Sequence, residues 1–214
     1  MITIIDYQMG NLHSVKRAFN RLRVDVRITT NPDDILSAKQ LILPGVGHFG
    51  KAMDHLKNTG LLEALNEAVL VQKKPVLGIC LGMQLMTKHS EEGDCEGLGW
   101  FDADVVRFQV KDTLQYKIPN IGWCDVKHAK ESKILNGINS NDPFYFVHSF
   151  HARTTDQSII LGTSEYESEF VCALEKENIC GVQFHPEKSH EVGLQLLSNF
   201  AEKTKDNGQR TKDN

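Results

Sequence analysis

Residues 75–86 read PVLGICLGMQLM, and this stretch decides the fold. Residues 76–79 are a short apolar run with β-branched members, which predicts a buried strand. Cys80 follows between Gly78 and Gly82, and the apolar positions after it have helical spacing. A strand, a tight turn and a helix around a glycine-flanked nucleophile are typical of a nucleophile elbow, here built on cysteine. A buried core cysteine beside two incidental glycines is the alternative interpretation.

The glycines and the turn have a physical reason in a nucleophile elbow. The turn is strained and leaves little room for a Cβ atom beside the nucleophile, so glycine is favoured on both sides of Cys80. A helix that begins directly after Cys80 stabilises a thiolate with the positive end of its dipole. The stretch therefore predicts a reactive Cys80 at the carboxyl end of a strand.

A second stretch, residues 181–189, reads GVQFHPEKS and supplies a partner for the cysteine. A cysteine nucleophile needs a base, and the base needs a group that orients it. His185 can be the base at the end of a strand, and Glu187 can reach its imidazole from the same loop. Pro186 restricts the backbone between them. By itself this stretch would also fit a surface histidine and a solvated glutamate.

An elbow cysteine combined with a distant His-Pro-Glu sequence resembles the class I glutamine amidotransferases, whose Cys-His-Glu triad has this chain order. Other landmarks resemble one group of that family, the HisH glutaminase subunits of imidazole glycerol phosphate synthase. These landmarks are DYQMGN at 6–11, LPGVG at 43–47, GW at 122–123 and YFVHS at 145–149. The resemblance extends from about residue 2 to residue 200.

The resemblance implies a glutaminase with Cys80, His185 and Glu187 as its catalytic triad. Ammonia from glutamine would pass to a HisF-type (β/α)8 cyclase subunit in a heterodimer. That partner would use it to make imidazole glycerol phosphate in histidine biosynthesis, which gives the complex lyase activity. No organic cofactor and no metal is implied, and the expected location is the cytoplasm.

The same resemblance assigns the surroundings of the triad. The oxyanion formed on glutamine needs backbone N–H donors, expected from Leu81, next to the nucleophile, and from Gly47 or a neighbour in its turn. Gln84 is one helical turn after Cys80 and can bind the carboxylate or amino group of glutamine. Ser149 and Phe150 match positions whose backbone holds glutamine.

Three further residues match positions that face the synthase subunit: Trp123, Tyr145 and Lys188. Each would otherwise be an ordinary amphipathic surface residue. His148 lies outside the His-Pro-Glu motif, and we interpret it as a structural histidine.

Length and composition limit the classes of protein. A chain of 214 residues fits one domain, expected over residues 1–201, followed by a disordered tail at 202–214 without apolar residues. The net charge of −4 gives no reason to expect nucleic acid or an anionic membrane as partner. The five cysteines have no zinc spacing, which favours a reducing compartment. No apolar run approaches the ~20 residues that span a bilayer.

Strands alternate with helical patterns up to about residue 90, which predicts parallel strands joined by helical crossovers. Asn11 is expected to cap the first helix and Asn31 the second. The second half is β-rich, with strand candidates at 105–110, 115–118, 123–126, 144–147, 159–162, 170–174 and 179–184. The predicted fold is therefore α/β, with a mixed, mainly parallel sheet and helices on both faces.

Two positions depart from the usual pattern of the HisH group. Gln8 stands where glycine is more common, and Cys124 stands where asparagine is common. Both departures leave the identity of the partner open. The alternative partner is a related synthase subunit that places ammonia on sugars of surface polysaccharide. A stand-alone cysteine hydrolase and a non-catalytic binding subunit are the rival classes, and the intact triad argues against the latter.

Overall fold

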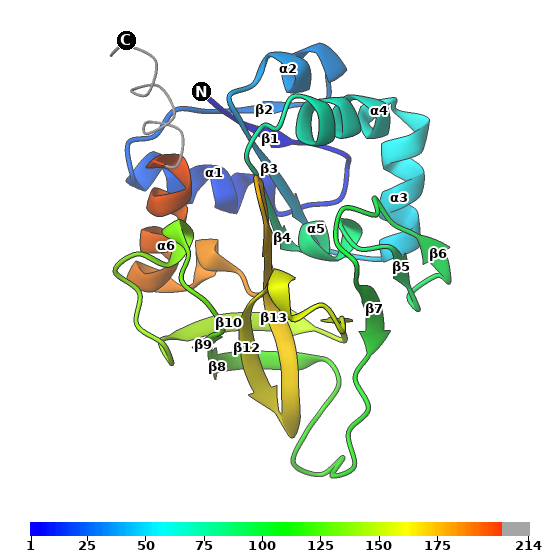
Figure 1. Cartoon of the computed structure of the whole chain (residues 1–214), viewed down its shortest axis with the longest axis vertical. Coiled ribbons are helices and arrows are strands. Elements are labelled where there is room, and N and C mark those ends of the chain that lie inside the picture. The colour runs from blue at the N-terminus through cyan, green and yellow to red at the C-terminus, as the bar shows by residue number, and fades with distance from the viewer. Residues whose placement is uncertain (203–214) are drawn as a thin grey trace.

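The computed structural model describes residues 1–202, which form a central sheet with helices on both of its faces (Figure 1). The helices are α1 (Leu12–Arg21), α2 (Pro32–Ser37), α3 (Phe49–Asn58), α4 (Leu61–Asn66), α5 (Leu81–Leu85) and α6 (His190–Glu202). The short helical turns are η1 (Glu67–Val71), η2 (Lys133–Leu135), η3 (Gln157–Ile159) and η4 (Pro186–Lys188).

The first half supplies the strands β1 (Ile2–Ile5), β2 (Val26–Thr29), β3 (Gln40–Gly45), β4 (Val76–Cys80), β5 (His89–Ser90) and β6 (Cys95–Glu96). The second half supplies β7 (Asp104–Arg107), β8 (Asn120–Asp125), β9 (Lys127–His128), β10 (Pro143–His148), β11 (Phe150–Arg153), β12 (Ile160–Tyr166), β13 (Ser168–Lys176) and β14 (Ile179–Val182).

The sheet has a parallel part and an antiparallel part. Strands β2, β1, β3, β4 and β14 are parallel neighbours in that order. The next strands pair antiparallel in succession, β13 with β14, β11 with β13 and β7 with β11, while β7 pairs parallel with β5 on its other side. Strands β8 and β10 form a separate two-stranded sheet. This arrangement confirms the predicted mixed α/β fold with a β-rich second half.

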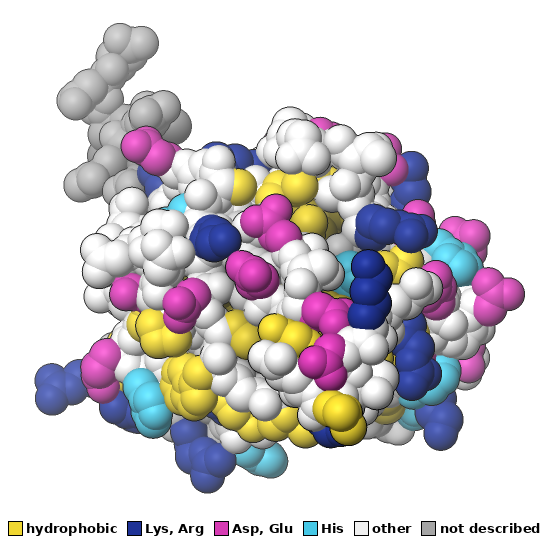
Figure 2. Space-filling view, turned by 90° about the horizontal axis from the view of Figure 1, so that it is seen from below, with side chains coloured by type: hydrophobic (Ala, Val, Ile, Leu, Met, Phe, Trp, Pro, Cys, Tyr) yellow, Lys and Arg dark blue, Asp and Glu magenta, His cyan; other side chains and the backbone are white. Residues whose placement is uncertain are grey.

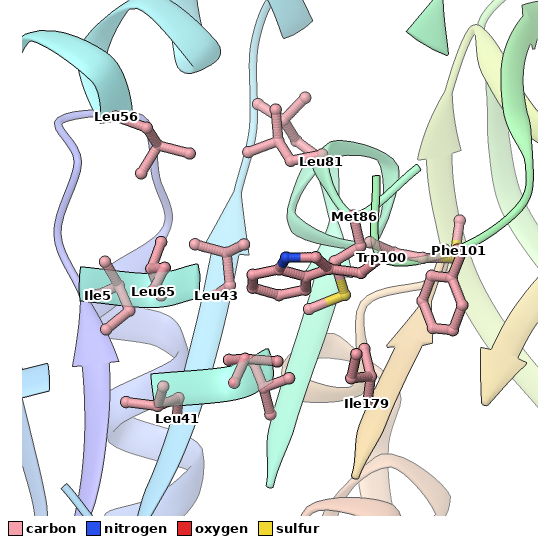
Figure 3. Packing of buried hydrophobic residues seen from close by; sticks show 14 of the residues in the cluster. Ile5, Leu41, Leu43, Leu56, Leu65, Leu81, Met86, Trp100, Phe101 and Ile179 are labelled. Carbon is pink, nitrogen blue, oxygen red and sulfur yellow. The ribbon is translucent and has the colours of Figure 1, made fainter. Parts of the chain in front are cut away.

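The strands of the parallel part are buried on both faces, which explains their continuous apolar sequences. Successive residues point to opposite faces, so Leu41 and Leu43 pack under the helices α2 to α5, while Ile42 packs on the other side with α1 and α6. Figure 3 shows the first of these clusters, in which Trp100 lies between Leu43 and Phe101, and Ile179 of the second half belongs to the same cluster. Both halves of the chain therefore share one core.

Several predicted elements differ in the structure. The strand predicted at 115–118 is absent, and the chain turns there because the Asp112 side chain accepts hydrogen bonds from the Leu114 and Gln115 N–H groups. The helical pattern at 61–71 divides into α4 and a π-helical turn, η1. The remaining strands are present with shifted ends, and β13 and β14 form an antiparallel hairpin.

The C-terminal helix α6 includes Glu202, so residue 202 belongs to this helix and not to the predicted tail. The rest of that predicted tail, residues 203–214, lies outside the described residues. Among residues 1–202, no helix has the length and apolar character needed to cross a membrane.

Candidate active site

Cys80 lies at the junction of β4 and α5 with an unusual backbone conformation, φ 54° and ψ −109°. A Cβ atom on Gly78 would lie 2.7 Å from the backbone nitrogen of Met83, and one on Gly82 would lie 1.6 Å from the Leu43 carbonyl oxygen. Both glycines are therefore required by close backbone approach, as expected for a nucleophile elbow. Cys80 is 6% exposed, so its thiol is accessible only from one side.

A cavity of about 310 Å³ opens beside the Cys80 thiol. Its walls come from the turn after β3, the start of α5, the loop after β5 and the junction of β10 with β11. The lining residues are Val46, Gly47, Cys80, Leu81, Gln84, Glu92, Pro119, Val147, His148, Ser149 and Phe150. A cavity of this size accommodates a small amino acid, and five of the predicted site residues besides Cys80 line it: Gly47, Leu81, Gln84, Ser149 and Phe150.

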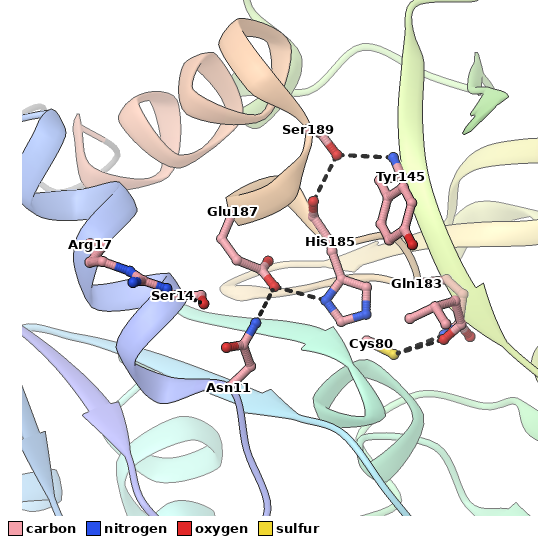
Figure 4. Close-up of polar contacts among 10 residues, drawn as sticks. Asn11, Ser14, Arg17, Cys80, Tyr145, Gln183, His185, Glu187 and Ser189 are labelled. Carbon is pink, nitrogen blue, oxygen red and sulfur yellow. Dashed lines mark hydrogen bonds and ion pairs between the residues drawn. The ribbon is translucent and has the colours of Figure 1, made fainter. Parts of the chain in front are cut away.

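His185 follows β14, the strand beside β4, and the pairing of Val182 with Ile79 brings it to the same edge of the sheet as Cys80 (Figure 4). Its Nδ1 atom donates a hydrogen bond to Glu187 Oε1 at 2.8 Å, and both side chains are 1% exposed. The structure therefore brings the three predicted catalytic residues together from sequence positions more than a hundred residues apart.

The surroundings of His185 favour its charged form. Burial lowers the pKa of its imidazole, but Cys80 and Glu187 raise it further, to about 9 instead of the ordinary 6.5. Within the described residues, Nε2 has no hydrogen-bond partner. The geometry thus suits an imidazolium that is paired with a thiolate and can donate a proton from Nε2.

Asn11 has a different role from the predicted helix cap. Its side chain makes no capping hydrogen bond to α1, and its Nδ2 atom instead donates to Glu187 Oε1 at 3.2 Å. The buried carboxylate attracts this donor because it needs partners besides His185. No local sequence signal points to this contact, since the two residues are 176 positions apart. In contrast, Asn31 does cap α2, accepting from Asp33 N.

Gln84 lies one turn after Cys80 on α5, as predicted, and its side-chain nitrogen is fully engaged inside the protein. Nε2 donates to the Phe150 carbonyl at 3.1 Å and to Gln183 Oε1 at 3.0 Å. Only the side-chain oxygen of Gln84 can therefore serve a ligand in the cavity, and it would accept from an amino group and not bind a carboxylate. The carbonyl of Ser149 accepts from Phe108 N at 3.0 Å.

The predicted oxyanion donors lie on either side of Cys80. Leu81 begins α5, while Gly47 lies in the turn after β3 with φ +114°. In the same turn, Val46 N already donates to the Met9 carbonyl at 3.4 Å. If the Val46 N–H group is the oxyanion donor, the peptide must rearrange locally before this group can reach an oxyanion at Cys80.

His148 is buried and uncharged. Burial lowers its pKa to about 3, although its Nδ1 atom donates to the Phe150 carbonyl at 2.8 Å. Its ring also packs against Phe108 and Phe170. These contacts agree with the structural interpretation of this histidine.

The three residues predicted to face a partner subunit lie together on the surface. Trp123 and Tyr145 are cross-strand neighbours on β8 and β10, and their rings meet edge to face at 5.8 Å. Lys188 Nζ lies 5.8 Å from the Tyr145 ring centroid, and His190 stacks on Trp123. Trp123 is 47% exposed and Ile121 on the same strand 60%.

Figure 2 views the side towards which β8 lies in Figure 1, where hydrophobic side chains gather next to basic and histidine side chains. This surface is connected to the site, because Tyr145 O accepts from His185 N at 2.9 Å and Ser189 Oγ bridges Tyr145 N and His185 O. A change at the surface strand β10 can therefore reach His185 through the backbone.

Sequence reasoning did not select two side chains that the structure places at the site. Glu92 lines the cavity, and its Oε2 accepts from Phe49 N at 2.8 Å. Gln183 is fully buried and its Nε2 lies 3.6 Å from Cys80 Sγ. Gln183 follows the last residue of β14, Val182, so strand alternation gives no direct signal for this contact.

No cluster of three or more histidine, cysteine, aspartate or glutamate side chains that could hold a metal is present among residues 1–202.

The chain is similar to known proteins over nearly its whole length. The family model described as glutamine amidotransferase class-I matches residues 3–204. HisH 2 of imidazole glycerol phosphate synthase from Methanococcus maripaludis is 48% identical over 94% of this chain and 98% of its own length. HisH 1 of the same organism is 43% identical over 94% of this chain and 99% of its own length.

Relatives in bacteria have similar identity. HisH 1 from Campylobacter jejuni is 48% identical, over 94% of this chain and 99% of its own length.

Solved structures support the fold. A putative GMP synthase subunit from Thermoplasma acidophilum superposes with a TM-score of 0.74 at 20% identity, over 99% of this chain and 97% of that chain. PurLQS from Thermotoga maritima gives a TM-score of 0.73 at 13% identity, over 94% and 97% of the two chains.

Proposed function

This chain belongs to the class I glutamine amidotransferase family, and on this premise we propose that it is the glutaminase subunit of imidazole glycerol phosphate synthase. It hydrolyses glutamine to glutamate and supplies the ammonia to a partner subunit for histidine biosynthesis. The observation that carries the proposal is that Cys80 lines one small cavity and that the hydrogen-bonded pair of His185 and Glu187 follows the neighbouring strand. The HisH relatives, at 43–48% identity over nearly the whole chain, support the choice of synthase.

In the proposed reaction, the Cys80 thiolate attacks the carboxamide carbon of glutamine and a C–S bond forms. The His185 imidazolium then donates its Nε2 proton to the leaving nitrogen, the C–N bond breaks, and ammonia departs. His185 next accepts a proton from water, whose oxygen attacks the thioester and breaks the C–S bond. Glutamate is released and the thiolate is restored. Glu187 keeps the imidazole oriented and stabilises its charged form throughout.

Binding of glutamine uses the polar groups of the cavity. The Gln84 side-chain oxygen and the Glu92 carboxylate both suit the α-ammonium group of the substrate, one as a neutral acceptor and one as a counter-charge. The backbone of Ser149 and Phe150 holds the rest of the amino acid. Leu81 N–H and a donor from the turn at Gly47 stabilise the oxyanion.

The proposed partner is a HisF-type (β/α)8 cyclase subunit, bound at the surface of Trp123, Tyr145 and Lys188. The hydrogen bonds from Tyr145 to His185 and Ser189 support this position, because they connect the surface to the catalytic turn. A sugar-modifying synthase subunit is the second candidate. The two numbered HisH chains of Methanococcus maripaludis favour keeping it, since one organism holds two such chains. The location proposed for the complex is the cytoplasm.

The test measures glutamate release by the chain alone, with the HisF-type subunit from the same genome, and with that subunit plus its nucleotide substrate. Because Val46 N–H is engaged by Met9, the isolated chain should rest with one oxyanion donor missing. Supplying one donor is worth about 100- to 1000-fold in rate, which is the stimulation we expect from the liganded partner. Full activity of the isolated chain would favour a stand-alone hydrolase, and stimulation only by the sugar-modifying subunit would favour the second candidate.

A further inference from the structure

A chain of side-chain amides connects the substrate cavity to the sulfur of Cys80. Gln84 Nε2 donates to the Phe150 carbonyl and to Gln183 Oε1. Gln183 Nε2 lies 3.6 Å from Cys80 Sγ (Figure 4). Gln84 is 5% exposed and Gln183 is fully buried. Water therefore does not compete for these hydrogen bonds.

The direction of each hydrogen bond follows from the first. A backbone carbonyl can only accept, so the atom of Gln84 that faces Phe150 O is its nitrogen. That nitrogen also faces Gln183, so the facing atom of Gln183 is its oxygen. The other end of the Gln183 amide, its NH2 group, is then left to face Cys80. The sulfur must accept, which a thiolate does far better than a neutral thiol.

We propose that Gln183 is a thiolate-stabilising residue, whose side-chain N–H holds Cys80 in its anionic form ready to attack glutamine. The inference rests on the proposed role of Cys80 as the nucleophile. When the thioester forms, the sulfur loses its charge and this hydrogen bond weakens. Gln183 therefore stabilises the thiolate in the resting enzyme and again when the thioester is hydrolysed.

A neutral donor is useful because the charged neighbours of Cys80 are mixed in sign. The titratable side chains around it are Tyr7 after β1, Glu92 after β5, His148 on β10, and His185 and Glu187 after β14. Of these, only His185 supplies positive charge, since burial keeps His148 neutral. Tyr7 adds no opposite charge, because burial first and Cys80 second raise the pKa of its phenol far above the ordinary value.

The experiment measures alkylation of Cys80 by iodoacetamide against pH, in the complete chain and in the variant Gln183→Met. Methionine is unbranched and of similar length, but it has no N–H to donate. We expect the pH midpoint of alkylation to rise by about one unit, with about tenfold slower alkylation at pH values below both midpoints. Above the new midpoint the variant should react at least as fast as the wild type, because its thiolate is no longer hydrogen-bonded. A merely structural defect would slow the reaction at every pH.

The matched control is Gln40→Met, the same change at another buried glutamine, whose Nε2 donates to the Phe200 carbonyl at 2.7 Å. This variant should lose stability and keep the wild-type midpoint. An unchanged midpoint in folded Gln183→Met would overturn the inference.

A second measurement needs no substitution at Gln183. It tests whether Gln183 stabilises the thiolate even if the Gln183→Met variant does not fold. The side-chain amide resonances of Gln183 in the wild-type protein should shift with the same pH midpoint as alkylation, and resonances that stay constant would overturn the inference. Failure of the proposed function is distinguishable, because iodoacetamide would then label the less buried Cys95 and Cys124 without preference for Cys80.

Discussion

The two turns that carry the catalytic groups lie side by side and are built in different ways. Strands β4 and β14 are parallel neighbours, so the turn after each reaches the same edge of the sheet. At the first turn, Cys80 has φ 54° and is fixed by backbone packed against Gly78 and Gly82. At the second turn, His185 has an ordinary φ of −103° and is fixed by hydrogen bonds.

This difference predicts how substitutions in each turn should affect folding and activity. The nucleophile turn depends on shape, because no side chain larger than hydrogen fits at its glycines. The His-Pro-Glu turn depends on charge and on directional hydrogen bonds: Glu187 accepts from His185 and from Asn11, and Ser189 donates to the His185 carbonyl. Substitutions at the first turn should therefore remove chemistry or folding outright, and those at the second should give graded losses.

The largest effect is expected for Cys80→Ala, which removes the nucleophile without changing the backbone. Glutamine hydrolysis in the complex with the partner should fall by about 10⁶-fold, as for other enzymes that lose the nucleophile of a triad. The control is synthesis from added ammonium salt by the same complex, which should continue at the wild-type rate. Residual glutamine-dependent activity above about 1% would contradict the assignment of the nucleophile.

Graded loss at the second turn is tested by His185→Ala and Glu187→Gln. The first should lose about 10⁶-fold and the second about 10⁴-fold in kcat, because the orienting acid contributes least in such triads. Steady-state glutaminase assays, with circular dichroism to verify folding, measure both. If either variant keeps the wild-type rate, that residue does not belong to the triad.

The steric nature of the first turn is tested by Gly82→Ala. The added Cβ would lie 1.6 Å from the Leu43 carbonyl, so backbone must move, and we expect a loss of about 3 kcal/mol in unfolding free energy. Gly50→Ala is the matched control, since its Cβ would meet His48 at an ordinary 3.4 Å. Urea denaturation distinguishes them, and equal midpoints in the two variants would show that the elbow tolerates a side chain.

The ionic nature of the second turn predicts a pH dependence. The pKa of His185 in the folded protein, about 9, is above its ordinary 6.5, so its charge stabilises the fold below pH 6.5 and this stabilisation is lost as pH rises through 9. Glu187→Gln should therefore destabilise by about 2 kcal/mol near pH 6.5 and by much less at pH 10. Denaturation curves at both values measure this, and a loss independent of pH would mean that His185 is neutral.

The smallest effect is expected for Asn11→Ala, which removes one hydrogen bond from the Glu187 carboxylate. A loss of about tenfold in kcat corresponds to one such bond, with little change in KM because Asn11 does not line the cavity. Asn20→Ala, on the exposed side of the same helix α1, serves as the control. A larger loss of kcat in Asn11→Ala than in Glu187→Gln would contradict the smaller role assigned to Asn11.

The same contrast explains how much of the site could be predicted from the sequence. The elbow is readable because its glycines, nucleophile and flanking apolar residues are contiguous, and the continuous apolar strands β3 and β4 follow from burial on both faces. The partners of the second turn are not contiguous. Asn11 and Gln183 reach the triad through the strand order of the sheet, which periodicity cannot supply.

The position of β14 in the sheet has a consequence for folding. This strand joins the parallel and antiparallel parts, yet residues 179–182 come near the end of the described chain. During synthesis, β4 must wait for its neighbour while about a hundred residues between them emerge, so its apolar edge stays open in the nascent protein. Such distant pairing slows folding and invites wrong association. The strand that positions His185 also joins the two parts of the sheet. Catalytic activity should therefore arise only once β14 has paired with β4.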